Sequence, residues 1–194
     1  MNKLSIAWYI SPILLLFSCT STNISPNTEK QVYLTDSAAV TLLPTAATKN
    51  DIQMFQSVVG NYAGKSFQMD AFLILNQDEI NVTLLNSFGT TMGTLLYNPA
   101  TLDFDSPVLP KSIKPAYIAF DFQLCFYEEE EIRHALEEAG LSLQASTKES
   151  QQLREVYEGT RLIISILRDK EKIQFVNKER GYSYIIYGDF NDIR

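Results

Sequence analysis

Residues 67–105 contain short apolar segments separated by turn residues, and this pattern constrains the fold more than any other feature of the chain. Ile80, Val82 and Leu84 alternate with polar residues, which is typical of a strand with one buried face. The predicted strands here are residues 67–75, 80–84, 92–97 and 102–105, and three more follow at 160–167, 172–176 and 182–187. The short turns between them favour an antiparallel meander.

Two helices are predicted between these groups of strands. Residues 116–127 are apolar enough for a buried helix, and residues 128–139 carry one apolar stripe that ends at Gly140. A third, amphipathic helix is predicted at residues 50–59, with Gly60 as its stop. Strands on both sides of a helical insert indicate an α+β fold with a curved antiparallel sheet.

Two segments have weaker patterns. Residues 32–43 have room for one or two short strands that end at Pro44. Residues 144–152 are polar and are expected to form a loop.

The N-terminus reads as a secretory leader. Asn2 and Lys3 give a short positive start, residues 4–17 are apolar, and a small residue precedes Cys19. This pattern is typical of a signal peptide over residues 1–18, and the segment is too short for an ordinary spanning helix. It resembles the leaders of bacterial lipoproteins, in which the cysteine corresponding to Cys19 becomes the acylated first mature residue. The alternative is a plain cleaved signal with a chance cysteine.

The expected mature chain has a short tether and one domain. Residues 19–31 are rich in Ser, Thr, Asn and Pro and are predicted to be a flexible tether after the lipidated cysteine. Residues 32–194 are predicted to form the domain, since about 160 residues are enough for one core. Loss of the leader removes Lys3 and changes the net charge from −7 to −8.

This acidic charge argues against nucleic acid as a partner and against recognition of anionic head groups by charge. Membrane association is therefore assigned to the acylated Cys19 and to apolar contact. Cys125 is the one cysteine left after acylation, so no intrachain disulfide is expected. We expect it to be a small buried hydrophobic residue.

The sequence offers little for catalysis. His134 is the single histidine, and Glu130 and Glu138 lie one turn away on its predicted helix, which places it on a charged, solvated face. Nucleophile-elbow, Walker A and dinucleotide glycine motifs are absent from the sequence. The expectation is a protein that is not an enzyme and has no cofactor or metal.

Asp121 is unusual because it lies among aromatic residues. If buried, it needs a cap or a cationic partner such as Arg133 or Arg161. The alternative is a polar contact with a ligand. An apolar cavity under a curved sheet would suit a hydrophobic ligand, although a filled core fits the pattern equally well.

From about Phe67 onward the chain resembles the outer-membrane lipoprotein receptor LolB and its relatives. Residues 81–97 carry that family's strand, Asn-x-apolar-Gly loop and returning strand. The chain is more similar still to an uncharacterised LolB-like lipoprotein family of aryl polyene lipid gene clusters. The segments that carry this resemblance are residues 87–90, 115–124, 132–140 and 181–184.

The resemblance implies an unclosed antiparallel β-barrel with helices covering its opening, and a cavity for acyl chains. It also implies that an exposed Phe88, in the Asn-x-apolar-Gly loop, helps insert cargo into the membrane. Ser87 departs from the proline common in LolB, which favours a glycolipid or polyene lipid cargo over lipoproteins. Strand alternation predicts the cavity-lining residues as Phe72, Ile74, Val82, Leu84, Leu96, Phe104, Ile164 and Ile166.

Together these features predict a monomeric outer-membrane lipoprotein that faces the periplasm and transfers a lipid or acyl-chain ligand. Thr20 follows Cys19, in place of the aspartate that retains lipoproteins in the inner membrane, so outer-membrane sorting is expected. A periplasmic carrier protein is the expected partner. The alternatives are a docking lipoprotein that recruits a periplasmic assembly without binding lipid, and a subunit of a lipid-modifying enzyme.

Overall fold

The computed structural model describes residues 30–109, 111 and 113–191. The leader, Cys19 and most of the predicted tether lie outside the described residues. The tether's last residue, Gln31, begins a short hairpin of β1 (Gln31–Tyr33) and β2 (Ala39–Thr41), which confirms the short strands predicted in residues 32–43. A short 3-10 turn, η1, follows at Thr45–Ala47.

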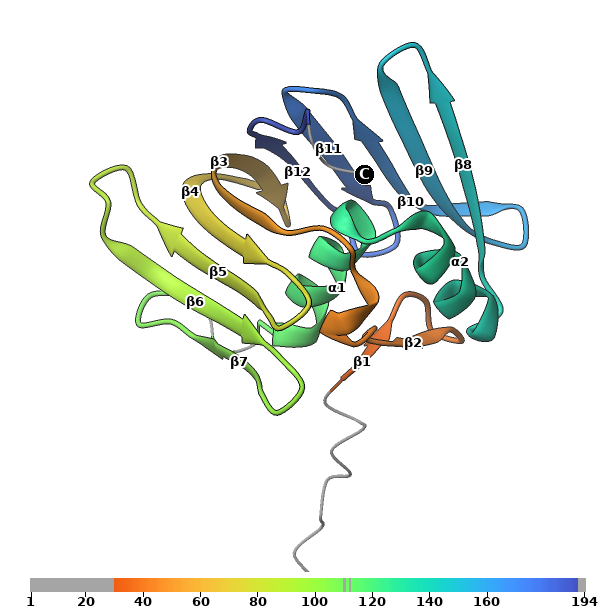
Figure 1. Cartoon of the computed structure of the whole chain (residues 1–194), viewed down its shortest axis with the longest axis horizontal. Coiled ribbons are helices and arrows are strands. Elements are labelled where there is room, and N and C mark those ends of the chain that lie inside the picture. The colour runs from red at the N-terminus through yellow and green to blue at the C-terminus, as the bar shows by residue number, and fades with distance from the viewer. Residues whose placement is uncertain (1–29, 110, 112, 192–194) are drawn as a thin grey trace, which may run out of the picture.

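Ten antiparallel strands form one curved sheet, in the order β7-β6-β5-β4-β3-β12-β11-β10-β9-β8 (Figure 1). One half of the sheet contains β3 (Ile52–Tyr62), β4 (Lys65–Leu75), β5 (Ile80–Leu85), β6 (Thr91–Tyr97) and β7 (Leu102–Asp105). The other half contains β8 (Ser142–Lys148), β9 (Gln151–Glu158), β10 (Arg161–Arg168), β11 (Lys172–Asn177) and β12 (Tyr182–Tyr187). Strands β7 and β8 are the two edges, so the sheet is open, as predicted.

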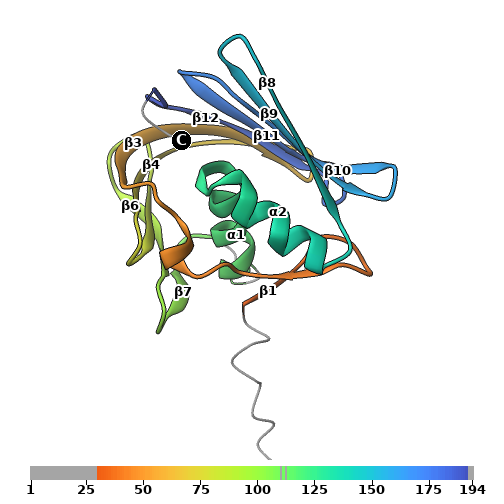
Figure 2. The same cartoon turned by 45° about the vertical axis from the view of Figure 1, so that its right-hand side comes forward.

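Two helices, α1 (Pro115–Phe126) and α2 (Glu129–Glu138), lie inside the concave side of the sheet (Figure 2). Helix α1 lies against β1, β6 and β7, and α2 lies against β2 and β8. The two predicted helices are therefore confirmed, with bounds within one residue of those expected. Among the described residues, no helix combines the length and the apolar character needed to cross a bilayer.

The core lies between the helices and the concave face of the sheet. Leu73 and Leu75 of β4 and Ile80 and Val82 of β5 have no accessible surface, and Phe120 of α1 is almost fully covered. Burial of each such side chain contributes about 1.5–3 kcal/mol, so this contact stabilises the curvature of the sheet.

The helix predicted at residues 50–59 is wrong, because this segment belongs to β3. Its apolar residues divide between the two faces of a strand: Ile52 and Val58 lie on the concave face, and Phe55 and Val59 lie on the convex face. Exposed apolar residues on the convex face gave the sequence a false helical spacing. The predicted stop, Gly60, lies inside the strand.

The polar loop predicted at residues 144–152 is also wrong. This segment pairs as a hairpin of β8 and β9, with Glu149 in a left-handed conformation at the turn. Strand β8 is an edge strand whose side chains are largely exposed, and Leu143 is its one fully buried residue. An edge strand buries little, so its sequence lacks the alternation by which strands are predicted.

Candidate functional site

The concave face changes along the strands from fully covered to partly open. In β4, Ala71, Leu73 and Leu75 have no accessible surface, whereas Phe67 and Met69, on the same face, are only half-buried. The helices contact strands towards both sides of the sheet and the β1–β2 hairpin, and they leave this end of the central strands less covered. The strands that pair with this end of β4 also carry half-buried residues on the concave face, so the less covered region includes them.

We call this region the open concave face, and it is apolar and uncharged. It consists of half-buried residues that pair across four adjacent strands: Val58, Gly60, Phe67, Met69, Leu84 and Tyr184. A Cβ at Gly60 would lie 2.3 Å from Cζ of Phe67, so a larger residue here would displace the ring. The Phe67 ring thus lies directly over the β3 backbone.

Helix α1 presents a stripe of half-buried residues, Tyr117, Ile118, Asp121 and Phe122, while most of its other residues are buried. Asp121 joins this stripe to the sheet. The Tyr182 hydroxyl lies 3.0 Å from Oδ1 and 2.9 Å from Oδ2 of Asp121 and donates to the carboxylate. The Asn177 side-chain amide donates in turn to the Tyr182 hydroxyl at 3.3 Å.

Burial raises the pKa of Asp121 to about 7, although hydrogen bonds from Tyr182 and Tyr184 and the charge of Arg180 oppose the shift. The residue as a whole is half-buried, and the loss of water around its side chain is the largest cause of the raised pKa. The side chain is therefore a carboxyl group whose charge is costly in this position.

Neither predicted cationic partner reaches Asp121. Arg133 pairs with Glu129 on α2 and donates to the Leu143 carbonyl at 2.5 Å. Arg161 pairs with two glutamates at the rim of the sheet. The two arginines are therefore wrong as cationic partners, and the Tyr182 hydroxyl provides the cap that the sequence allowed in their place.

The predicted cavity-lining residues divide between the two faces. Val82, Leu84, Phe104, Ile164 and Ile166 lie on the concave face, and Leu84 belongs to its open part. Phe72, Ile74 and Leu96 lie on the convex face, so their predicted side is wrong. The segments around them carry apolar residues at consecutive positions, so alternation in the sequence does not fix the register.

Phe88 lies at the tip of the β5–β6 hairpin with 90% of its surface exposed, which confirms its predicted exposure. The Asn86 side-chain oxygen accepts hydrogen bonds from the backbone amides of Phe88 and Thr90, each at 2.9 Å. Gly89 has φ +75°, a conformation that favours glycine. The turn is thus fixed by its polar residues and holds the phenyl ring outward.

Polar hollows occur elsewhere on the described surface. One of about 240 Å³ lies along α2 beside His134, and another of about 190 Å³ lies between the start of α2 and the β8–β9 hairpin. His134 is exposed and lies 3.3 Å from Glu138, as its predicted solvated face requires. In the part of the chain that the structure describes, no group of three acidic, histidine or cysteine side chains is arranged to hold a metal.

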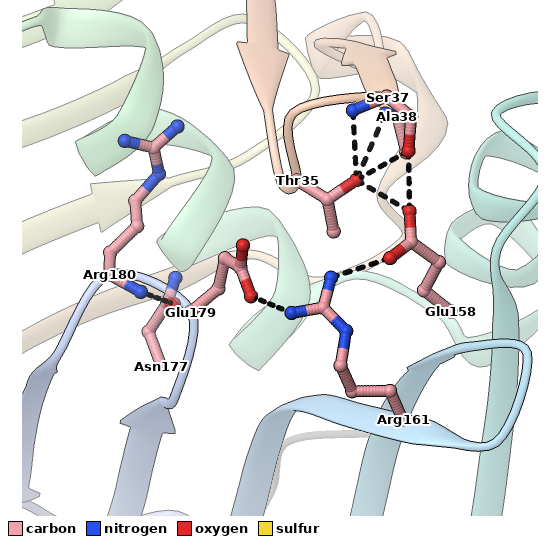
Figure 3. Close-up of polar contacts among 8 residues, drawn as sticks. All are labelled: Thr35, Ser37, Ala38, Glu158, Arg161, Asn177, Glu179 and Arg180. Atoms are coloured by element: carbon pink, nitrogen blue, oxygen red, sulfur yellow. Dashed lines mark hydrogen bonds and ion pairs between the residues drawn. The ribbon is translucent and has the colours of Figure 1, made fainter.

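A polar cluster that the sequence did not reveal clamps the β1–β2 hairpin to the rim of the sheet (Figure 3). Glu158 accepts hydrogen bonds from Ser37 at 2.6 Å and Thr35 at 2.7 Å, and it pairs with Arg161 at 2.5 Å. These donors, Ser37 first, lower the pKa of Glu158 to about 2. Because Thr35 and Ser37 lie more than 100 residues before Glu158, no local signal predicts their contact with it.

Comparisons with known proteins give a family and distantly similar solved structures. A search of curated proteins found no match. A solved structure from Vibrio parahaemolyticus, described as a putative outer membrane lipoprotein-sorting protein domain, shares 11% identity over 77% of this chain and 87% of its own, with a TM-score of 0.32. Residues 53–187 match a family described as a protein of unknown function, DUF3261. This match spans β3 to β12, and the chain therefore belongs to the DUF3261 family.

Proposed function

We propose that this protein is an outer-membrane lipoprotein, anchored through Cys19 and facing the periplasm, that binds and transfers a lipid or acylated cargo. The observation that supports this proposal is the open concave face. It offers half-buried apolar side chains beside the α1 stripe, where Asp121 and Arg180 are the neighbouring charged residues. Such a surface suits an acyl chain and needs no catalytic group.

The energetics of this proposal are favourable. Each buried methylene contributes about 0.8 kcal/mol, so ten methylenes give about 8 kcal/mol before the costs of association and ordering. A ligand of this size binds with useful but reversible affinity, which a transfer protein needs. Entry requires Phe67 or the α1 stripe to move, since both partly occupy the face.

Phe88 supplies the transfer step in this proposal. It lies at the tip of the hairpin whose strands carry Leu84, so the tip and the open concave face are at the same end of β5. Contact of the phenyl ring with the bilayer interface would bring the cargo to the membrane. We propose a glycolipid or polyene lipid as cargo, in keeping with the resemblance to the aryl polyene type, and a periplasmic carrier as donor.

The test is lipid binding by matched variants. Leu84→Glu places a carboxylate on the concave face, and Thr83→Glu places one at the adjacent residue on the convex face. We expect Leu84→Glu to abolish displacement of bound Nile red by fatty acyl ligands, and Thr83→Glu to retain it, with similar circular dichroism for both. Mass spectrometry of lipids that copurify with the wild-type chain identifies the cargo. If the wild type binds no lipid, the transfer function is wrong.

The convex face favours a second candidate, a docking lipoprotein. Phe55 is 66% exposed, and its ring centroid lies 5.0 Å from that of Phe72 on the neighbouring strand. Tyr187 is also exposed on this face. If Phe55→Glu impairs function in cells while lipid binding is absent from the wild type, the docking role replaces the transfer role.

A further inference from the structure

The carboxyl group of Asp121 lacks an ion-pair partner among the described residues, although it lies in an aromatic environment. Its hydrogen bonds come from tyrosine hydroxyls, chiefly Tyr182. A carboxylate accepts about four hydrogen bonds, and the single Tyr182 proton is shared between its two oxygens. Buried carboxylates are normally paired or fully hydrogen-bonded, so this one retains capacity to accept from a further donor.

Arg180, whose charge lowers the pKa of Asp121, makes its hydrogen bonds to other groups. Its guanidinium donates to the Tyr33 carbonyl and, at 2.9 Å, to the Tyr117 hydroxyl. It also lies over the Tyr117 ring, with its Cζ 4.4 Å from the ring centroid. These contacts hold the β1–β2 hairpin against α1, and the guanidinium acts on Asp121 through its charge without forming an ion pair with it.

The aromatic rings around Asp121 give this position a rigid wall. Phe175 and Tyr184 are nearly parallel, with centroids 4.7 Å apart and an interplanar angle of 4°. Tyr182 stacks on the same group at 5.9 Å from Phe175. Tyr184 also belongs to the open concave face, so the carboxylate lies at the boundary between this wall and the apolar surface.

We propose that Asp121 binds the polar head of the ligand, and that it selects amphiphiles whose head donates hydrogen bonds and carries no negative charge. An amine or a hydroxyl satisfies the unused acceptor capacity, whereas a fatty carboxylate brings a like charge close to Asp121. This inference rests on the proposed lipid-binding function and adds a choice of ligand class to it.

The test uses three ten-carbon amphiphiles, decylamine, decanol and decanoate, each below its aggregation limit at pH 8. The full chain carrying Cys19→Ala is loaded with the neutral dye Nile red, and displacement is measured for each ligand. Wild-type Asp121 should favour the amine over the carboxylate by about tenfold or more, since charges a few ångströms apart interact strongly near a protein interior. Decanol should fall between them.

Asp121→Asn removes the charge and keeps an oxygen that accepts from Tyr182, so the fold is retained and the tenfold preference should fall to about threefold or less. Asp70→Asn is the matched control, because it removes a carboxylate from the convex face of β4 and should leave the preference unchanged.

Two results would overturn the proposal in distinguishable ways. If all three amphiphiles displace the dye equally, or if Asp121→Asn keeps the wild-type preference, the head-group role is wrong and lipid binding stands. If none of the three displaces the dye, the proposed lipid-binding function fails together with it.

Discussion

Replacement of Phe88 by glutamate separates a role in stability from a role at the membrane. Because 90% of the Phe88 surface is exposed, its contacts in the folded state contribute only about a tenth of the free energy of full burial. This contribution is about 0.2–0.3 kcal/mol. The backbone hydrogen bonds of the turn go to Asn86 and do not involve the ring. The melting temperature should therefore stay close to that of the wild type.

Transfer should respond much more strongly. Full burial of a phenylalanine in the bilayer interface contributes about 1.5–3 kcal/mol, which corresponds to a change of about 10- to 150-fold in rate if the contact forms in the rate-limiting step. The assay is transfer of a fluorescent lipid from the protein to liposomes, run beside thermal melting. Val108→Glu is the control, since Val108 is also an exposed apolar loop residue but lies outside the β5–β6 hairpin.

A large fall in melting temperature with normal transfer would refute the reasoning, because Phe88 would then be a core residue without an insertion role. Equal loss of transfer in the Phe88 and Val108 variants would show a general effect of surface charge.

Three further predictions concern the anchor, the rim and the core. Cys19→Ala should abolish acylation and detergent partition, which globomycin sensitivity and intact-mass measurement check. Because folding lowers the pKa of Glu158, this carboxylate stabilises the fold at pH values above its unfolded pKa near 4.5, and the contribution is lost as the pH falls towards 2. In urea titrations, the free energy of unfolding of Glu158→Gln should therefore depend less on pH in this range than that of the wild type. Arg154 is buried and donates to the carbonyls of Leu124 at 2.8 Å and Tyr127 at 2.9 Å, so Arg154→Ala should cost about 2–4 kcal/mol in urea unfolding, with partial recovery in Arg154→Lys.

The strands that the sequence predicted well are those with clear turn residues at both ends. Strand β7 has the predicted bounds, and its Leu102 and Phe104 point to one face while Asp103 and Asp105 point to the other. The turn before it is fixed by Asn98, whose side chain accepts from two backbone amides. Local hydrogen bonding of this kind is encoded within a few residues, and so it is readable from the sequence.

The face of the sheet on which each apolar residue lies was harder to predict. In β4, consecutive apolar residues from Ala71 to Leu75 provide two equally apolar faces, and only pairing with β3 and β5 decides which is covered. The helices cover the side with Leu73, and Phe72 remains on the convex face. A register that depends on tertiary contact is not contained in the local pattern.

Asp121 shows how a site can be noticed in a sequence before its partners are known. A carboxylate among aromatic residues is conspicuous, but its partner Tyr182 lies 61 positions away on β12. The sequence called for a cap or a cationic partner, because a buried charge needs compensation. In the structure tyrosine hydroxyls provide the cap, and burial raises the pKa of the carboxyl group to about 7.

This arrangement joins the fold to the proposed function. Folding covers one end of the concave face with α1 and α2, and the polar cluster around Glu158 and Arg180 ties the β1–β2 hairpin to the rim of the sheet. The other end of the face keeps apolar side chains half-buried, and the Asp121 carboxylate beside it forms no ion pair within the described residues. A protein selected only for stability gains from filling such a region and pairing such a charge. An apolar region and a carboxylate without an ion pair, together at the end of β5 that carries Phe88, are what a reversible lipid carrier requires.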